Sequence, residues 1–178
     1  MAIVSPSSAH NFVVSVCIGL GSESTEAHLV ADQLVGANLA GHDSHGIGML
    51  PSYVAGAVNG HLKVNQTPKI TTDAGALVVF DGQSGFGQVN GYEAMNEGIK
   101  RAEQFGVAII GLRNSYHIGR IGHWAEQCAV AKMASVHFVN VIGHTPLVAP
   151  HGGAQSRFGT NPFCAAVPGK GNEPAALL

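Results

Sequence analysis

Apolar residues recur at helical spacing along the first sixty residues of the chain. The first helix is predicted by Phe12, Val13, Val16, Cys17 and Leu20, and the second by Val30, Leu34 and Ala37. Ser22 or Ser24 is expected to cap the second helix, and Gly41 to end it.

A third, short helix is predicted to begin near Asp43 or Ser44. Its apolar face would carry Leu50, Val54 and Val58. The pattern therefore predicts a helical layer over residues 1–62.

The pattern changes after residue 62, where short apolar runs alternate with helical stretches. Helices that alternate with strands favour an α/β segment over residues 63–178, built on a mixed, partly parallel sheet with helices. The expected strands are 69–72, 76–81, a buried strand at 107–112, 134–141 and 162–167, and another strand begins at Pro174. The expected helices are 88–105, stopped by Gly106, and 122–133, and residues 143–161 are expected to form a loop.

Composition narrows the class of protein. Among 178 residues only 11% are charged, whereas 24 are glycine, so we expect much of the surface to be covered by a partner subunit or by further chain. Nine Lys and Arg residues are scattered along the chain, which argues against a nucleic-acid-binding protein. No apolar run approaches the ~20 residues that span a bilayer, and the first residues lack the pattern of a secretory signal.

The three cysteines, Cys17, Cys128 and Cys164, lie too far apart for a metal knuckle, and their odd number argues against a disulfide framework. We expect reduced thiols, most of them in the core, and a cytoplasmic protein.

A glycine-rich stretch at residues 82–91 follows a predicted strand and precedes a predicted helix, as a phosphate-binding loop would. However, its spacing is G-x-G-x-x-x-G, and no acidic residue lies between Glu103 and Glu126, where a dinucleotide fold needs one. We interpret the stretch as a tight strand-to-helix turn and predict a fold that is not of the Rossmann type.

Residues His42, Asp43, Ser44 and His45 place two imidazoles, a carboxylate and a hydroxyl at the start of the predicted third helix. The positive end of a helix would lower the pKa of a histidine there, which suits a general acid or base near neutral pH. The alternative is structural: Asp43 or Ser44 caps the helix, and His45 packs beside it.

A second candidate segment, residues 117–123, lies between a predicted strand and a helix, where α/β proteins bind ligands. Arg120 could hold a carboxylate or phosphate there, or it could form an ion pair with Glu126. His117 and His123 match a loose zinc spacing, but no cysteine pair or second zinc motif accompanies them, so no metal is assigned.

Three ordered motifs together resemble one family. The motifs are His42–Tyr53, His117–Gly122 and Gly159-Thr160-Asn161-Pro162-Phe163, and the chain is similar over residues 21–178 to the malate/L-lactate dehydrogenase family of non-Rossmann type. The resemblance implies a homodimeric enzyme that moves hydride between NAD or NADP and a 2-oxo or 2-hydroxy acid.

The resemblance also implies roles for individual residues. It makes His45 the proton donor and acceptor, with Ser44 beside it at the substrate. It assigns cofactor contacts to His45, Gly119, Arg120, Ile121, Ala175, Ala176, Leu177 and Leu178. It brings Arg120 and Thr160 to the substrate together with Ser44.

Two departures from the family pattern carry information. Met49 stands where many members have an arginine that grips the substrate carboxylate, which implies a substrate with a more apolar side chain. Family chains are about twice as long, so the α/β segment is expected to be a truncated form, incomplete at its C-terminal end. The alternative function is therefore an inactive fragment that keeps the fold and the dimer surface but lacks a complete cofactor site, and a histidine-based metal-binding module is a weaker third hypothesis.

Overall fold

The computed structural model describes residues 4–143, 145–171 and 174–178. Its contacts divide the chain into two compact units, residues 1–120 and 121–178, which are described separately. The predicted change from helices to α/β structure near residue 62 falls inside the first unit, and as a domain boundary it stays a prediction.

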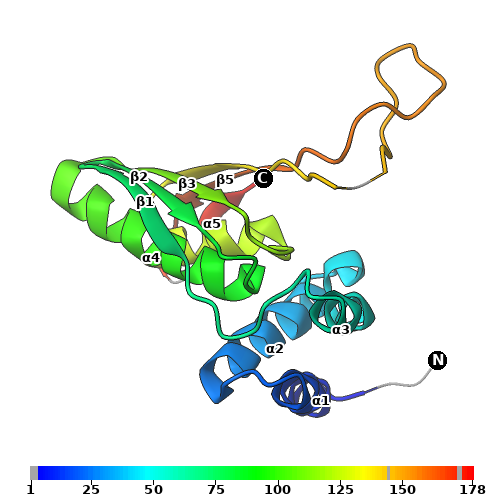
Figure 1. Ribbon diagram of the computed structural model, residues 1–178. Helices are drawn as coiled ribbons and strands as arrows, with labels where there is room; N and C mark the ends of the chain where they lie inside the picture. Colours follow the sequence, from blue (N-terminus) through cyan, green and yellow to red (C-terminus); the bar gives the residue numbers. More distant parts are fainter. Residues whose placement is uncertain (1–3, 144, 172–173) are drawn as a thin grey trace. The chain divides into compact units, whose positions relative to one another are not determined.

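The first unit begins with two helices, α1 (Pro6–Gly19) and α2 (Ser24–Leu39) (Figure 1). Helix α1 begins before the apolar residues that predicted it, because Ser5 accepts a hydrogen bond from Ser8 N and Pro6 suits the first helical turn. Helix α2 ends where predicted, with Gly41 in the left-handed region at φ +77°.

The predicted cap of α2 is wrong. Glu23 is the N-cap residue and makes no side-chain cap bond. The Ser22 hydroxyl instead donates to Glu26, and that buried carboxylate also accepts from the Asn65 backbone N–H. Ser22 and Glu26 therefore hold the segment that leads into the sheet. These hydrogen bonds lower the pKa of Glu26, but burial of the carboxylate has the larger effect, so the pKa is raised.

The third helix begins later than predicted. Two 3₁₀ turns, η1 (Asp43–His45) and η2 (Ile47–Met49), precede α3 (Leu50–Val58). The Asn38 side chain explains this, because its oxygen accepts from Ile47 N at 2.8 Å and its nitrogen donates to Asp43 at 2.5 Å. The predicted face of α3 is also partly wrong: Val58 is 76% exposed, and Tyr53 is buried in its place.

One hydrophobic core joins α1, α2 and α3 to the segment that contains Phe86 and Val89. Its buried members are Val13, Cys17, Ala27, Val30, Ala31, Leu34, Leu50, Tyr53, Leu62, Phe86 and Val89. The residues that predicted α2, namely Val30, Leu34 and Ala37, are all buried, which confirms its amphipathic pattern.

A three-stranded sheet follows, in the order β1 (Lys69–Ala74), β2 (Leu77–Asp81) and β3 (Ile109–Arg113). Strand β2 pairs antiparallel with β1 and parallel with β3, so the predicted mixed sheet is confirmed. The parallel strands are joined by α4 (Gly87–Phe105), which ends at Gly106 in the left-handed region, as predicted. Val78, Phe80 and Ala94 form the core between α4 and the sheet.

The expectation that β3 is buried is wrong, because Ile109 is 61% exposed. Among the described residues of the first unit, β3 pairs with β2 alone.

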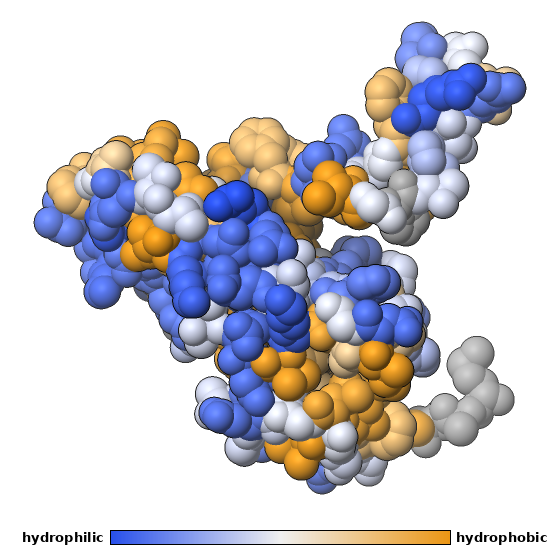
Figure 2. All heavy atoms as spheres, viewed as in Figure 1, coloured by the Kyte–Doolittle hydropathy of each residue, from blue (hydrophilic) through white to orange (hydrophobic). Residues whose placement is uncertain are grey.

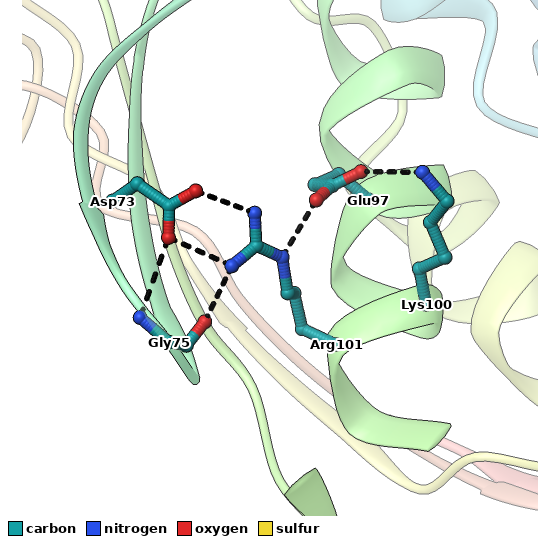
Figure 3. A network of polar contacts seen from close by, with 5 residues as sticks. All are labelled: Asp73, Gly75, Glu97, Lys100 and Arg101. Carbon is teal, nitrogen blue, oxygen red and sulfur yellow. Dashed lines mark hydrogen bonds and ion pairs between the residues drawn. The ribbon is translucent and has the colours of Figure 1, made fainter. Parts of the chain in front are cut away.

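An ionic network ties α4 to the β1–β2 hairpin (Figure 3). The Arg101 guanidinium donates to both carboxylate oxygens of Asp73 at 2.7 Å, to Glu97 at 2.6 Å and to the Gly75 carbonyl at 2.9 Å. Lys100 completes the network at Glu97. This two-pronged contact lowers the pKa of Asp73 and fixes the helix along the hairpin.

The glycine-rich stretch is a tight strand-to-helix turn, as predicted. It packs against main chain instead of forming an open, phosphate-binding loop. A Cβ at Gly87 would lie 2.2 Å from the His117 carbonyl oxygen. The buried Asn90 amide donates to the Gly82 carbonyl at 2.8 Å and to Ser115 Oγ at 3.1 Å. The turn is therefore held against the segment that follows β3.

The second unit contains α5 (Ile121–Val130) and a sheet in the order β4 (Ser135–Phe138), β5 (Phe163–Pro168) and β6 (Pro174–Leu177). Both strand pairs are antiparallel. Ala125 of α5 packs on Cys164 and Ala166 of β5. The predicted loop is confirmed for the described residues of 143–161, apart from one bridge between Val148 and Phe158.

The chain's surface and thiols complete the description. All three cysteines are buried, as expected, and none of them lies in a disulfide. Apolar side chains that include Phe12, Ile18 and Val58 are exposed on α1 and α3, and Figure 2 shows apolar surface over this part of the chain. No helix within the described residues is long and apolar enough to cross a membrane.

The contact between Gly87 and the His117 main chain predicts a large effect of a small substitution. We expect Gly87→Ala to lower the free energy of unfolding by at least about 2 kcal/mol, because the new methyl group meets backbone atoms that cannot rotate away. Urea denaturation measures this. The matched control is Gly36→Ala in α2, where nothing lies within 4 Å and a gain of ~0.5–1 kcal/mol is expected. Equal effects of the two substitutions would contradict the packing argument.

Candidate active site

The candidate site of the first unit is centred on His45. This residue ends the η1 turn, where it is half-buried, and its Nδ1 lies 2.9 Å from the Ser44 hydroxyl. The Asn38 amide holds η1 in this form, because it bonds to Asp43 at the start of the turn and to Ile47 just after its end. A Cβ at Gly46 would lie 2.2 Å from Asn38 Oδ1, so the turn and the amide are in close contact.

A second imidazole stacks on the first. The ring of His117, in the loop after β3, lies with its centroid 5.4 Å from that of His45, at an interplanar angle of 27°. The sequence placed the two histidines in separate motifs and assigned no role to His117. The fold brings them together because the first turn of α4 packs on the His117 main chain.

Burial keeps both imidazoles neutral near pH 7. It lowers the pKa of His117 to about 4, with a smaller contribution from His45, and it lowers the pKa of His45, with a smaller contribution from His42. The lowered pKa of His45 agrees with the sequence analysis, but the predicted cause does not. The dipole of an α-helix does not act there, because η1 is a single 3₁₀ turn of three residues.

The alternative role of Asp43 or Ser44 as a helix cap is wrong as well. The residue that caps η1 is His42, and no side chain caps either η1 or α3. Asp43 accepts from the Asn38 amide, and Ser44 contacts His45.

Two further polar side chains, Tyr53 and Gln88, extend the contacts of His117 into the core. The buried Tyr53 hydroxyl lies 2.8 Å from His117 Nδ1, and the buried Gln88 amide nitrogen donates to the same hydroxyl at 2.8 Å. The sequence analysis assigned no role in the site to Tyr53 or to Gln88. A glutamine in the first turn of an amphipathic helix carries no signal that separates it from a surface residue.

Gly119 belongs to the same surroundings. It is buried with φ +72°, and a Cβ on it would meet Gln33 Oε1 at 3.2 Å and Gln88 Nε2 at 3.6 Å. Gln33 Oε1 and Gln88 Oε1 are buried acceptors that lack a hydrogen-bond partner among the described residues. The left-handed glycine leaves the main chain of this turn open to close approach.

The remaining predicted site residues are described within their own units. Arg120 is half-buried at the end of the first unit. The second unit contains Ile121 at the start of α5, Thr160 before β5, and Ala175 to Leu178 in and after β6. Their association with His45 stays a prediction.

The described residues contain no group of three or more His, Cys, Asp and Glu side chains that could hold a metal ion.

Comparison with known proteins decides the family. The sequence model of the malate/L-lactate dehydrogenases matches residues 4–177. This chain belongs to the malate/L-lactate dehydrogenase family. It is 56% identical over 168 residues to hydroxycarboxylate dehydrogenase B of Escherichia coli (strain K12), a match that covers 94% of this chain and 46% of the relative.

More distant members agree in sequence and in fold. The chain is 40% identical to a malate dehydrogenase of Pyrococcus abyssi, over 90% of this chain and 44% of that protein. The solved structure of malate dehydrogenase from Pyrococcus horikoshii OT3 is similar with a TM-score of 0.91 and 36% identity, over 99% of this chain and 49% of that one. The chain thus spans about half the length of the relatives that it matches.

The lowered pKa of His117 predicts how stability depends on pH. Unfolded histidine has a pKa of about 6.5, so between that value and about 4 the unfolded chain binds more protons than the folded chain, and stability falls as pH falls. From about pH 7 to about pH 5 this effect lowers the free energy of unfolding by about 2 kcal/mol. Urea denaturation at both pH values measures it.

The variant His117→Gln should lose less stability than the wild type over this interval, whereas His61→Gln, at an exposed loop position, should lose as much as the wild type. The same loss in the wild type and in His117→Gln would show that His117 is not held neutral by the fold.

Proposed function

We propose that this chain provides the His45 part of the active site of a nicotinamide-dependent 2-hydroxy-acid dehydrogenase, which interconverts 2-oxo and 2-hydroxy acids. The observation that supports the proposal most is the neutral His45, bonded to Ser44 and stacked on His117, in a chain of the malate/L-lactate dehydrogenase family. An imidazole with a lowered pKa is a base near pH 7, as removal of a hydroxyl proton requires.

In the proposed reaction His45 exchanges one proton with the substrate oxygen. Because Nδ1 is bonded to Ser44, the proton is taken up or released at Nε2. As a 2-hydroxy acid is oxidised, Nε2 accepts the hydroxyl proton while the hydrogen on C2 leaves as hydride with both electrons of its bond. In reduction, His45 returns the proton to the carbonyl oxygen, where negative charge develops. NAD or NADP, when bound, supplies the hydride or accepts it.

The proposed contacts to the cofactor are His45, Gly119, Arg120, Ile121, Ala175, Ala176, Leu177 and Leu178. Gly119 fits this role because its left-handed conformation leaves no side chain over the turn. The buried carbonyl oxygens of Gln33 and Gln88, unpartnered among the residues described, suit the N–H groups of a nicotinamide carboxamide.

The proposed contacts to the substrate are Ser44, Arg120 and Thr160. Arg120 would bind the carboxylate with its two-pronged guanidinium. Met49, half-buried in η2, is uncharged where many family members have an arginine, which favours a 2-oxo acid with an apolar side chain. A homodimer in the cytoplasm completes the proposal, and the exposed apolar residues of α1, such as Phe12, suit a surface that a second subunit covers.

The test is a fluorescence titration of the chain with NADH, and then with NADPH, followed by coenzyme oxidation with phenylpyruvate and with 2-oxoglutarate. We expect saturable binding, and turnover that falls by about 10²-fold or more in His45→Ala, because the proton donor is lost. His61→Ala is the matched control, since it removes an exposed imidazole, and it should keep both binding and turnover.

The alternative is a fragment that keeps the fold without a complete cofactor site. A folded sample that neither binds coenzyme nor turns over either 2-oxo acid would support that alternative and reject a self-sufficient dehydrogenase. Turnover that is unchanged in His45→Ala would reject the role of His45.

A further inference from the structure

The Tyr53 hydroxyl joins two polar side chains that the proposed proton transfer does not use. It lies between Gln88 Nε2 and His117 Nδ1, at 2.8 Å from each. Tyr53 and Gln88 are both fully buried, so water does not compete for these bonds. Leu50 and Phe86 belong to the same core as Tyr53, and the Tyr53 ring meets that of Phe86 edge to face at 5.8 Å. The hydroxyl therefore has a fixed place.

The chemistry of these groups gives the bonds a direction. An amide nitrogen can only donate, so the Tyr53 oxygen accepts from Gln88. The single hydrogen of that hydroxyl is then donated to the other neighbour, His117 Nδ1. A ring nitrogen that accepts a hydrogen bond carries no proton, so neutral His117 must carry its proton on Nε2.

We propose that Gln88 and Tyr53 are positioning residues that fix His117 in the tautomer with the proton on Nε2 and hold its ring against His45. Burial assists them, because it keeps His117 uncharged near pH 7. The ring of His117 thereby presents an N–H donor at its other edge, ready for an oxygen atom of a ligand. The functional importance of this donor rests on the proposed function of His45, whereas the tautomer itself does not.

The arrangement also explains why buried polar groups are retained in an otherwise apolar core. A phenylalanine at position 53 would fill the same space but would leave Gln88 Nε2 and His117 Nδ1 without their bonds. Each buried polar group left without a bond destabilises the folded chain, because its lost hydrogen bond to water is not replaced. With the hydroxyl present, both groups are bonded, and the ring of His117 has one preferred orientation.

The test is a long-range ¹H–¹⁵N correlation spectrum of the whole chain, labelled with ¹⁵N-histidine and recorded near pH 7 without coenzyme. The signals of His117 are assigned by their loss in His117→Gln. We expect Nδ1 at the shift of an unprotonated, pyridine-like nitrogen and Nε2 at that of a protonated, pyrrole-like nitrogen. In Tyr53→Phe the two shifts should move toward each other, as in a mixture of tautomers.

The matched control is Tyr116→Phe, because Tyr116 also contacts the Tyr53 ring but bonds to the Ser52 carbonyl instead of an imidazole. It should leave the His117 shifts unchanged. Gln88→Leu removes the donor that sets the direction of the hydroxyl, and it should produce mixed tautomers with Tyr53 in place.

Two results would overturn the proposal. A proton on Nδ1 in the wild type would mean that the hydrogen bonds run from His117 through Tyr53 to Gln88. Unchanged His117 shifts in Tyr53→Phe would mean that the hydroxyl does not set the tautomer. If Tyr53→Phe fails to fold, the wild-type spectrum and Gln88→Leu still decide. Because no coenzyme is present, a chain that fails to bind NADH can still confirm or refute the positioning role.

Discussion

The close approach of the first turn of α4 to the loop after β3 sets the geometry of the first unit's polar centre. Gly87 lets the helix lie against the main chain of His117, where any side chain would collide with backbone atoms. The next residue, Gln88, then falls within reach of Tyr53, and Tyr53 within reach of the His117 ring. A packing constraint between two backbones thus becomes a constraint on the orientation of an imidazole. The apolar core around Phe86 and Val89 keeps the helix in this position.

The polar groups of this centre differ from the ionic network toward the C-terminal end of α4. Arg101, Asp73 and Glu97 form charge-assisted bonds close to the surface and hold a helix to a hairpin, a structural task. Around His45 and His117 there is no such compensating charge within the hydrogen bonds described, and burial favours the neutral rings. The first arrangement uses charge to hold two elements together, whereas the second keeps its imidazoles uncharged near pH 7. Both depend on side chains carried by the same helix.

Much of the fold could be predicted because it follows local rules. The 3.6-residue period located α1 and α2, and left-handed glycines ended α2 and α4 at Gly41 and Gly106. The start of α3 could not be predicted, because the Asn38 side chain of the preceding helix holds the intervening turns. The motif around His45 was visible in the sequence. Its stacking on His117 and the bonds of Tyr53 nevertheless join residues at least 35 positions apart, and periodicity carries no information about such pairs. The assignments of Thr160 and of the segment from Ala175 onward stay predictions for the same reason.

The stacked imidazoles have a consequence for the energetics of anion binding. The charge of a protonated His45 would oppose protonation of His117, so proton uptake by the two rings is coupled. A carboxylate bound beside the rings would favour their protonated form, so its binding would take up a proton from solution. One coupling free energy then governs both events. Protonation would raise the affinity for the anion by the same factor by which the anion raises the affinity for the proton. The heat released on binding would include the ionisation of whichever buffer gives up that proton, so a calorimeter would record different enthalpies for the same complex in different buffers.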